Sequence, residues 1–423
     1  MPYTSRRPRS GQTSSAPRAA HFGGGSRRSG GGGGRPFGGG RSNSRGPKKD
    51  YIHPSRFVKA AKPVSEEKYE PVNMFADFAM NPIIMRNIKD KGYVAPSPVQ
   101  DQAIPHGLAG RDVIGVANTG TGKTVAFAVP VIHKLMEDPN AKALIIAPTR
   151  ELAQQIEEER RALARGGGLY GALLIGGSNM GFQLRDLQRG VRMVVGTPGR
   201  IMDHMQRGSL NLNEYNVVVL DEVDRMLDMG FVNDVRTILG ELHEDRQSFF
   251  FSATLDNRVR DLIHTFANDP ALVSVKTGDT SDNVHQDIVP YETQSDKIEQ
   301  LHRLLEGGQI SKAIVFDDTQ RSVERLSQEL VARGFKADAI HGGKTQGQRK
   351  RALDRFKRDD ITVLVATDVA ARGIDVKDIS HVINYSTPQS YEDYVHRIGR
   401  AGRAGATGYA LTFVTDDRRD SRY

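Results

Sequence analysis

Short apolar runs alternate with longer amphipathic segments from about residue 75 almost to the end of the chain. Most of these runs lack polar side chains, as in Val217-Val218-Val219-Leu220. Continuous runs of this kind are typical of parallel strands that are buried on both faces of a sheet. The segments between them, such as 151–164, have the spacing of amphipathic helices. This alternation predicts a doubly wound α/β fold.

The candidate strands fall into two sets. The first set comprises residues 113–117, 144–147, 172–175, 192–196, 217–220 and 248–252. The second set comprises residues 287–291, 313–316, 337–340, 362–366, 381–384 and 409–414. Because residues 193–197 resemble residues 363–367, we expect two related domains. In open sheets of this kind, ligands bind beyond the carboxyl ends of the strands.

A polar segment without periodicity separates the two sets of strands, as expected for an interdomain linker. The predicted organisation is a disordered tail at 1–50, a transition segment at 51–72, domains at 73–275 and 285–418, a linker at 276–284 and a short tail at 419–423. The pattern predicts no role for the transition segment, which three prolines interrupt.

The composition limits the class of protein. The chain has 423 residues, 38% of them hydrophobic, and no cysteine, which excludes a disulfide framework and a thiolate metal site. No apolar run approaches the ~18 residues of a membrane span. The N-terminus also lacks the apolar core of a signal peptide. We therefore expect a soluble, cytoplasmic protein without a membrane partner.

Positive charge is concentrated in the first 50 residues, which carry a net charge of +10, whereas the remainder carries −2. This segment also contains 13 glycines and few aromatic residues, so it cannot bury enough apolar surface to fold by itself. Its arginines suit phosphate contacts and stacking on bases. This composition favours a nonspecific nucleic-acid arm, while a flexible spacer is the alternative.

A glycine-rich loop follows the first apolar run and precedes an amphipathic segment. It consists of Ala117, Asn118, Thr119, Gly120, Thr121, Gly122, Lys123 and Thr124. Small residues let backbone N–H groups approach the phosphates of a nucleoside triphosphate. Lys123 can reach the terminal phosphates, and the hydroxyl of Thr124 can ligate Mg²⁺.

Two further clusters complete the chemistry of phosphoryl transfer. Asp221 and Glu222 directly follow the strand at 217–220. Asp221 is placed to hold Mg²⁺, while Glu222 can accept the proton of the water that attacks the γ-phosphate. Arg400 and Arg403 have the spacing to neutralise this phosphate from the second domain. Each cluster alone is typical of a solvated surface, but their combination with the loop favours ATP hydrolysis.

With these motifs in this order, residues 75–416 resemble a DEAD-box RNA helicase of the bacterial type, with two RecA-like domains. The resemblance implies that Tyr93 stacks on adenine and that Gln100 reads its edge. Phe75 is either part of this motif or a core residue. Asp375 corresponds to the residue near the ribose. The resemblance also implies coupling of hydrolysis to domain movement through Asp224, Ser252, Thr254 and His396.

The family resemblance also implies contacts to the phosphates and 2′-hydroxyls of RNA, which do not read its sequence. In the first domain these residues are Pro148, Thr149, Arg150, Gly177, Thr197, Gly199 and Arg200. In the second domain they are Thr319, Gln346, Arg349, Thr367 and Arg372. Two positions depart from the family pattern, since Val223 replaces alanine and Ala401 replaces threonine. Neither change removes a charge or a ligand.

The expected function is RNA-stimulated ATP hydrolysis that closes two domains on one RNA strand and separates short duplexes or remodels RNA–protein complexes. ATP and Mg²⁺ are the expected cofactors, and a monomer is the expected state. An ATP-gated RNA clamp with little unwinding and a DNA-directed motor are the alternatives. The sequence does not identify the RNA or any ribosomal or RNA-decay partner, although the absence of eukaryotic targeting signals fits a bacterial cytoplasm.

Overall fold

The computed structural model describes residues 52–61, 69–118, 120–275, 283–371, 374, 376, 378–402 and 407–415. The predicted tails at 1–50 and 419–423, and residues 276–282 of the predicted linker, lie outside the described residues.

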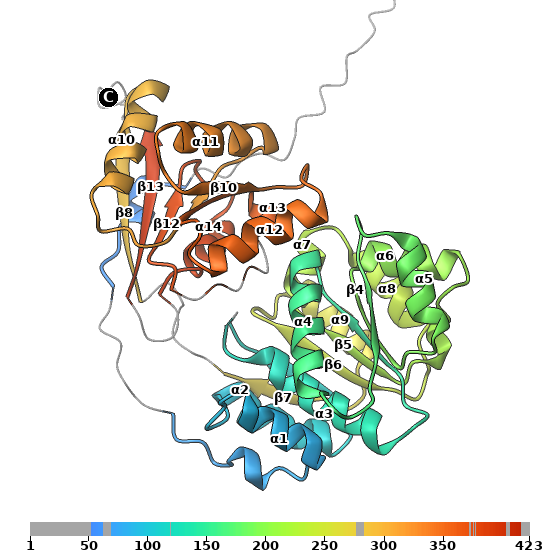
Figure 1. The fold of residues 1–423 in the computed structure, drawn as a ribbon. Helices are drawn as coiled ribbons and strands as arrows, with labels where there is room; N and C mark the ends of the chain where they lie inside the picture. The colour runs from blue at the N-terminus through green and yellow to red at the C-terminus, as the bar shows by residue number, and fades with distance from the viewer. Residues whose placement is uncertain are drawn as a thin grey trace, which may run out of the picture. The chain divides into compact units, whose positions relative to one another are not determined.

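The first sheet contains seven parallel strands in the order β3-β4-β2-β5-β6-β1-β7 (Figure 1). Their bounds are β1 (Val113–Val116), β2 (Ala143–Ile146), β3 (Gly171–Leu174), β4 (Met193–Gly196), β5 (Val217–Leu220), β6 (Gln247–Ser252) and β7 (Ala271–Ser274). Because all the strands are parallel, all their carboxyl ends meet at one edge of the sheet. The segments that follow them therefore lie along that edge.

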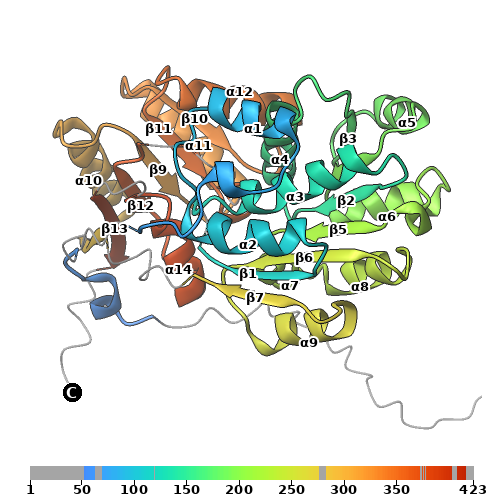
Figure 2. The same cartoon turned by 90° about the horizontal axis from the view of Figure 1, so that it is seen from below.

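Helices cover both faces of the first sheet, as Figure 2 shows for α1, α2 and α3 on one side and for α8 and α9 on the other. One face is covered by α1 (Pro82–Asp90), α2 (Pro98–Leu108), α3 (Lys123–Glu137) and α4 (Arg150–Leu163). The other is covered by α5 (Met180–Gln188), α6 (Pro198–Gln206), α7 (Val223–Asp228), α8 (Val232–Gly240) and α9 (Asn257–Phe266). Two short 3₁₀ helices, η2 (Phe75–Asp77) and η3 (Leu212–Glu214), complete this unit.

Each central strand contributes to both cores because successive side chains point to opposite faces. In β2, Ile145 packs with the helices of one face, whereas Leu144 and Ile146 pack with those of the other. All four residues of this strand are buried. This two-sided burial explains why the strand has no polar position.

The second sheet contains six parallel strands in the order β10-β11-β9-β12-β13-β8. Their bounds are β8 (Val284–Tyr291), β9 (Ala313–Phe316), β10 (Ala337–Ile340), β11 (Val363–Ala366), β12 (His381–Asn384) and β13 (Gly408–Thr415). The helices of this unit are α10 (Gln294–Glu306), α11 (Gln320–Ala332), α12 (Gln346–Lys357), α13 (Asp368–Ala371) and α14 (Tyr391–Ile398). The first two pack on one face of the sheet, and the other three pack on the opposite face.

The prediction of two doubly wound parallel sheets is confirmed, and every predicted strand is present with small shifts at its ends. The sequence pattern missed β7, an edge strand in which Leu272 and Ser274 are exposed. The predicted linker extended too far, because β8 already begins at Val284, where the side chain is fully buried.

The segment with no predicted role packs on the second sheet domain. The 3₁₀ helix η1 (Pro54–Phe57) inserts the fully buried ring of Phe57 against Tyr394, with 4.7 Å between ring centroids. Lys59 exchanges two backbone hydrogen bonds with Gln286 of β8. This segment therefore belongs to the core of a domain whose first strand begins more than 200 residues later in the chain.

None of the helices in the described part of the chain has the length and apolar character that a membrane crossing requires.

Candidate active site

The glycine-rich loop connects β1 to α3 at the carboxyl edge of the first sheet. Gly120 and Gly122 have φ angles of 86° and 94°, in the left-handed region that favours glycine. A Cβ atom on Gly122 would also lie only 2.4 Å from Nε2 of Gln100. Glycine is therefore required at this position both by its backbone conformation and by the close approach of Gln100.

Lys123 is the first residue of α3, and its side chain is buried. Its Nζ atom makes no hydrogen bond to any of the residues that the structure describes. Burying an ammonium group costs free energy unless hydrogen-bond acceptors pair with its N–H donors. The phosphate oxygens of a nucleotide at this helix N-terminus would supply such acceptors.

The acidic motif turns the chain sharply from β5 into α7. Glu222 adopts φ and ψ angles of 53°, a left-handed conformation that costs free energy for a residue with a Cβ atom. The backbone N–H of Glu222 donates to Oδ1 of Asp221 at 2.9 Å. On the other side of the turn, Oε2 of Glu222 lies 3.4 Å from Nη1 of Arg225. These contacts fix both carboxylates at the end of the strand.

The pKa values of the two acids shift in opposite directions, although both side chains are buried. Burial raises the pKa of Asp221 to about 6, and the charge of Lys123 only partly offsets this effect. Burial also opposes the ionisation of Glu222, but the positive charges of Arg225 and Lys123 outweigh it and hold the pKa of Glu222 below its ordinary value. Glu222 is therefore ionised at neutral pH, as a proton acceptor must be.

The segment after β6 ties the acidic motif to its neighbouring strand. The backbone N–H of Asp224 donates to the hydroxyl of Ser252 at 3.3 Å. Oδ2 of Asp224 in turn accepts hydrogen bonds from Ala253 and Thr254. The structure thus brings together Asp224, Ser252 and Thr254, the three first-domain residues predicted to couple hydrolysis to movement.

The strand order places the predicted motifs in two adjacent groups along one edge. The neighbours β5, β6 and β1 carry the acidic motif, the segment 252–254 and the glycine-rich loop. The neighbours β3, β4 and β2 carry the residues predicted to contact RNA. The residues predicted for nucleotide chemistry and those predicted for RNA contacts therefore lie in separate halves of the same edge.

The residues predicted to contact RNA in the first domain lie close together. The guanidinium of Arg150 lies against Gly176 and Gly177, where a Cβ atom on Gly177 would be 2.5 Å from Nη1. Arg200 donates from Nη1 to the carbonyl of Ser178 at 3.3 Å. The remaining members of this group lie at or just before the start of a helix, namely Pro148 and Thr149 before α4, and Thr197 and Gly199 at the start of α6.

In the second domain, the corresponding residues follow the neighbouring strands β9, β10 and β11. Thr319 caps α11 by accepting a hydrogen bond from Ser322. Nε2 of Gln346 donates to Gln154 at 3.2 Å, and Nη2 of Arg349 lies 2.8 Å from a carboxylate oxygen of Glu151. Thr367 directly follows β11. Gln346 and Arg349 thus contact α4 in this structure, and the role of all four residues in RNA binding stays a prediction.

The basic motif of the second domain begins in the last turn of helix α14 and continues beyond its end at Ile398. Arg400 is buried and donates to the carbonyl of Ile374 at 3.0 Å. His396 lines a small cavity together with Asp368, Arg397 and Arg400. The sequence pattern missed the central ion pair of this cavity, in which Arg397 donates from Nε and Nη2 to Asp368 at 2.6 and 2.7 Å.

The two residues predicted to contact adenine differ in their surroundings. Gln100 is buried, accepts a hydrogen bond from the backbone N–H of Ser97 and donates to the carbonyl of Gly122. Tyr93 is partly buried and donates to Glu159 at 3.4 Å. Phe75 is buried in the core of the first domain with its ring 6.3 Å from that of Tyr93. Gln100 therefore positions the glycine-rich loop in this structure.

Both halves of the chain match models of helicase families. Residues 97–262 match the DEAD/DEAH box helicase model, and residues 296–405 match the helicase conserved C-terminal domain model. The chain is 44% identical over 343 residues to the DEAD-box ATP-dependent RNA helicase CshA of Bacillus subtilis, covering 81% of this chain and 69% of that protein. The chain belongs to the family of DEAD-box ATP-dependent RNA helicases.

A second relative of this DEAD-box protein is the ATP-dependent RNA helicase CshA of Listeria monocytogenes, which is 44% identical over 341 residues. That match covers 80% of this chain and 66% of the relative, so the chain spans about two thirds of the relative's length. Among solved structures, Dbp5 of S. cerevisiae bound to RNA and ADP BeF3 is similar, with a TM-score of 0.72 and 30% identity. This match covers 81% of this chain and 90% of that one.

Four of the predicted site residues of this DEAD-box protein lie outside the described residues. They are Thr119, Arg372, Asp375 and Arg403. Their predicted roles toward the phosphates, the RNA and the ribose stay predictions.

Proposed function

We propose that the first domain binds and hydrolyses ATP at the carboxyl edge of its sheet. Lys123 and the N–H groups of the glycine-rich loop bind the phosphates, and Glu222 accepts the proton of the attacking water. Thr124 and Asp221 would hold Mg²⁺, which would neutralise phosphate charge there. The observation that carries this proposal is the buried Nζ of Lys123, which makes no hydrogen bond within the described residues.

RNA binds along the other half of the same edge in this proposal. Arg150 and Arg200, held beside Gly177 and Ser178, suit contacts to consecutive phosphates of one strand. The second domain adds Thr319, Gln346, Arg349, Thr367 and Arg372. Because these groups address phosphates and 2′-hydroxyls, binding does not depend on base sequence.

Domain closure then couples the two sites. ATP and RNA favour the closed state, in which Arg400, Arg403 and His396 approach the nucleotide. Tyr93, Gln100 and Asp375 contact its adenine and ribose. Closure on one strand of a short duplex bends it and releases the partner strand, and hydrolysis permits reopening. The chain would thereby act as a monomer that unwinds short RNA duplexes or remodels RNA–protein complexes.

The test is a comparison of ATP turnover with single-stranded RNA, with single-stranded DNA of equal length and without nucleic acid. We expect stimulation by RNA and little by DNA. Strand release from a short duplex, measured in the same reactions, distinguishes unwinding from clamping. Equal stimulation by RNA and DNA would contradict the assignment of an RNA substrate.

A further inference from the structure

A large basic pocket opens at the opposite edge of the first sheet, where strands β3 and β4 begin. It has a volume of about 920 Å³, within the range of ligand-binding pockets. The chain segments that form it are the end of α4 with the glycine-rich turn before β3, and the end of α5 with the turn before β4. We call it the arginine pocket. Because it lies at the amino ends of the strands, it is separate from the candidate active site.

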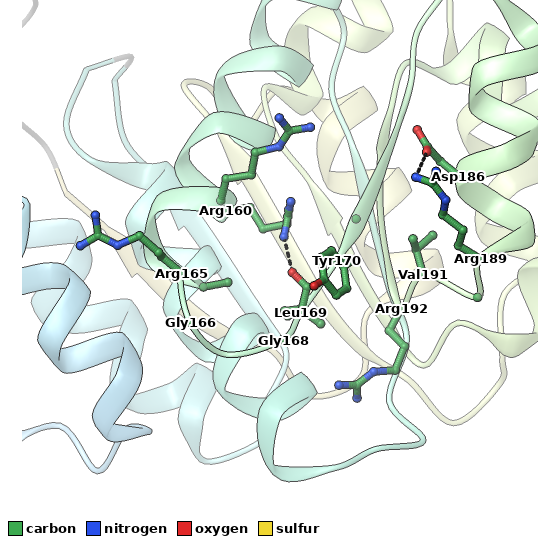
Figure 3. Close-up of a pocket in the computed structure, with 14 residues that line it drawn as sticks. Arg160, Arg165, Gly166, Gly168, Leu169, Tyr170, Asp186, Arg189, Val191 and Arg192 are labelled. Carbon is green, nitrogen blue, oxygen red and sulfur yellow. Dashed lines mark hydrogen bonds and ion pairs between the residues drawn. The ribbon is translucent and has the colours of Figure 1, made fainter.

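Arginines from both segments line this pocket, and Figure 3 labels four of them. They are Arg160, Arg161, Arg165, Arg189 and Arg192. Three carboxylates neutralise part of this charge, namely those of Glu157, Asp90 and Asp186. The balance is an excess of two positive charges, which favours an anionic ligand.

Three of the arginines can still bind a ligand. The side chains of Arg161, Arg165 and Arg189 are 68, 67 and 75% exposed. Arg165 donates from Nη2 to Asp90, and Arg189 donates from Nη1 to Asp186. A guanidinium group has five N–H donors, so each of these side chains can also bind a phosphate oxygen. Arg160, in contrast, is buried and holds the carbonyl of Leu169, which shapes the pocket.

An exposed aromatic ring lies among these charges. Tyr170 is 76% exposed, and Figure 3 shows it between Arg160 on one side and Arg189 on the other. In the preceding turn Gly166 and Gly168, both with positive φ, have no side chain that could cover the ring. An aromatic platform beside arginines is the arrangement by which proteins bind single-stranded nucleic acid.

We propose that the arginine pocket is a second RNA-binding site, which stacks a base of single-stranded RNA on Tyr170 and binds the flanking phosphates through Arg161, Arg165 and Arg189. An acidic polypeptide would use the charges but would gain little from an exposed tyrosine ring. The chain's own tail is excluded as the occupant by charge, because its first 50 residues carry a net charge of +10. RNA has both bases that can stack on the ring and phosphates that can bind the arginines.

The absence of tryptophan from the sequence allows a site-specific test. Tyr170→Trp in the full chain places a single tryptophan in the pocket, and its fluorescence is titrated with a short oligouridylate without ATP. We expect saturable quenching, because a stacked base quenches the indole. Tyr409→Trp is the matched control, since Tyr409 is also exposed but lies at the start of β13 in the other domain. It should show no saturable quenching.

The arginines are tested in the same Tyr170→Trp background. Arg165→Gln together with Arg189→Gln should weaken binding about tenfold and reduce the log–log salt slope by about 1.4, which is 0.7 for each lost phosphate contact. Arg236→Gln, on the exposed surface of α8, should change neither value. Thermal unfolding of all variants confirms that the fold is intact.

Four outcomes would overturn the proposal. The first is a lack of quenching at position 170, and the second is binding that does not depend on Arg165 and Arg189. The third is equal affinity for uridine monophosphate and oligouridylate, which would indicate a site for a free nucleotide. The fourth is displacement by polyglutamate but not by RNA, which would indicate an acidic protein partner. Because the titration contains no ATP, its failure would leave the proposed ATPase activity untouched.

Discussion

Oδ2 of Asp224 accepts hydrogen bonds from both the backbone N–H and the hydroxyl of Thr254, at 2.9 and 3.2 Å. The N–H of Ala253 donates to the same oxygen at 3.0 Å. One carboxylate oxygen therefore joins the acidic turn after β5 to the segment after β6. This connection links the acidic turn directly to the end of the neighbouring strand.

Thr254→Val removes one of these three donors. We expect ATP hydrolysis within about threefold of the parent, because both backbone donors remain, and a loss of about 1 kcal/mol in the free energy of unfolding. RNA strand release per ATP hydrolysed should fall several-fold. Thr265→Val is the control, since the Thr265 hydroxyl donates only within α9, to the carbonyl of Asp261. An unchanged ratio of strand release to hydrolysis would contradict the coupling role.

The second prediction concerns the segment around η1, which precedes the first domain in the chain and packs on the second. Phe57→Ala removes a fully buried ring from the core of the second domain and should lower its free energy of unfolding by about 3–5 kcal/mol. Val58→Ala is the adjacent control. Because Val58 is 52% exposed, this substitution should lower the free energy of unfolding by less than about 0.5 kcal/mol. Denaturant unfolding of the full chain, followed by a probe in the second domain, measures both. Similar losses for the two variants would show that the segment does not stabilise this domain.

The sequence predicted the central strands well because they are buried on both faces. In β2 and β5 no position can be polar, so each strand stands out as an apolar run. β7 was missed because it lies at an edge and exposes every second residue. The packing of Phe57 against Tyr394 has no local signature, since more than 300 residues separate the two rings in the chain.

The sequence predicted those parts of the candidate site whose residues are neighbours in the chain. Asp221 and Glu222 are adjacent, and the loop that ends in Lys123 is a continuous motif. The partners of buried charges were not predictable, because Asp368 and Arg397 meet only when α13 and α14 pack together. The arginine pocket was missed for the same reason, since its two segments come together only in the folded sheet.

Val223 is the departure from the family pattern in the acidic motif, and its side chain is fully buried in the first domain. Val223→Ala should lower the free energy of unfolding by about 1–2 kcal/mol and keep ATP hydrolysis within about threefold. The reason is that the lost methyl groups bind neither ion nor water. Steady-state ATPase assays beside thermal unfolding measure the two effects. A loss of activity as large as that of Asp221→Ala would show that Val223 takes part in the chemistry.

A further prediction concerns the contribution of the basic tail to RNA affinity. Deletion of residues 1–50 should weaken RNA binding but preserve RNA-stimulated ATP hydrolysis, because the proposed catalytic groups all come later in the chain. Each single-strand phosphate that is no longer neutralised should reduce the log–log salt slope by about 0.7. Binding measured over a range of salt concentrations provides this slope. If the slope does not change, the tail is only a spacer.

We assign phosphate binding to Lys123 and proton transfer to Glu222, and two substitutions separate these roles. Glu222→Gln keeps the length of the side chain but cannot accept the water's proton, so ATP still closes the domains and turnover stops. Lys123→Ala removes the buried ammonium, so ATP-dependent closure itself fails.

The most direct measurement is the dissociation of fluorescent RNA from both variants and the parent, with ATP and with ADP. We expect Glu222→Gln to retain RNA longer with ATP than the parent does, and Lys123→Ala to show no difference between ATP and ADP. Hydrolysis of ATP by Glu222→Gln at the parent rate, or rapid release of RNA from this variant with ATP, would contradict the role assigned to Glu222.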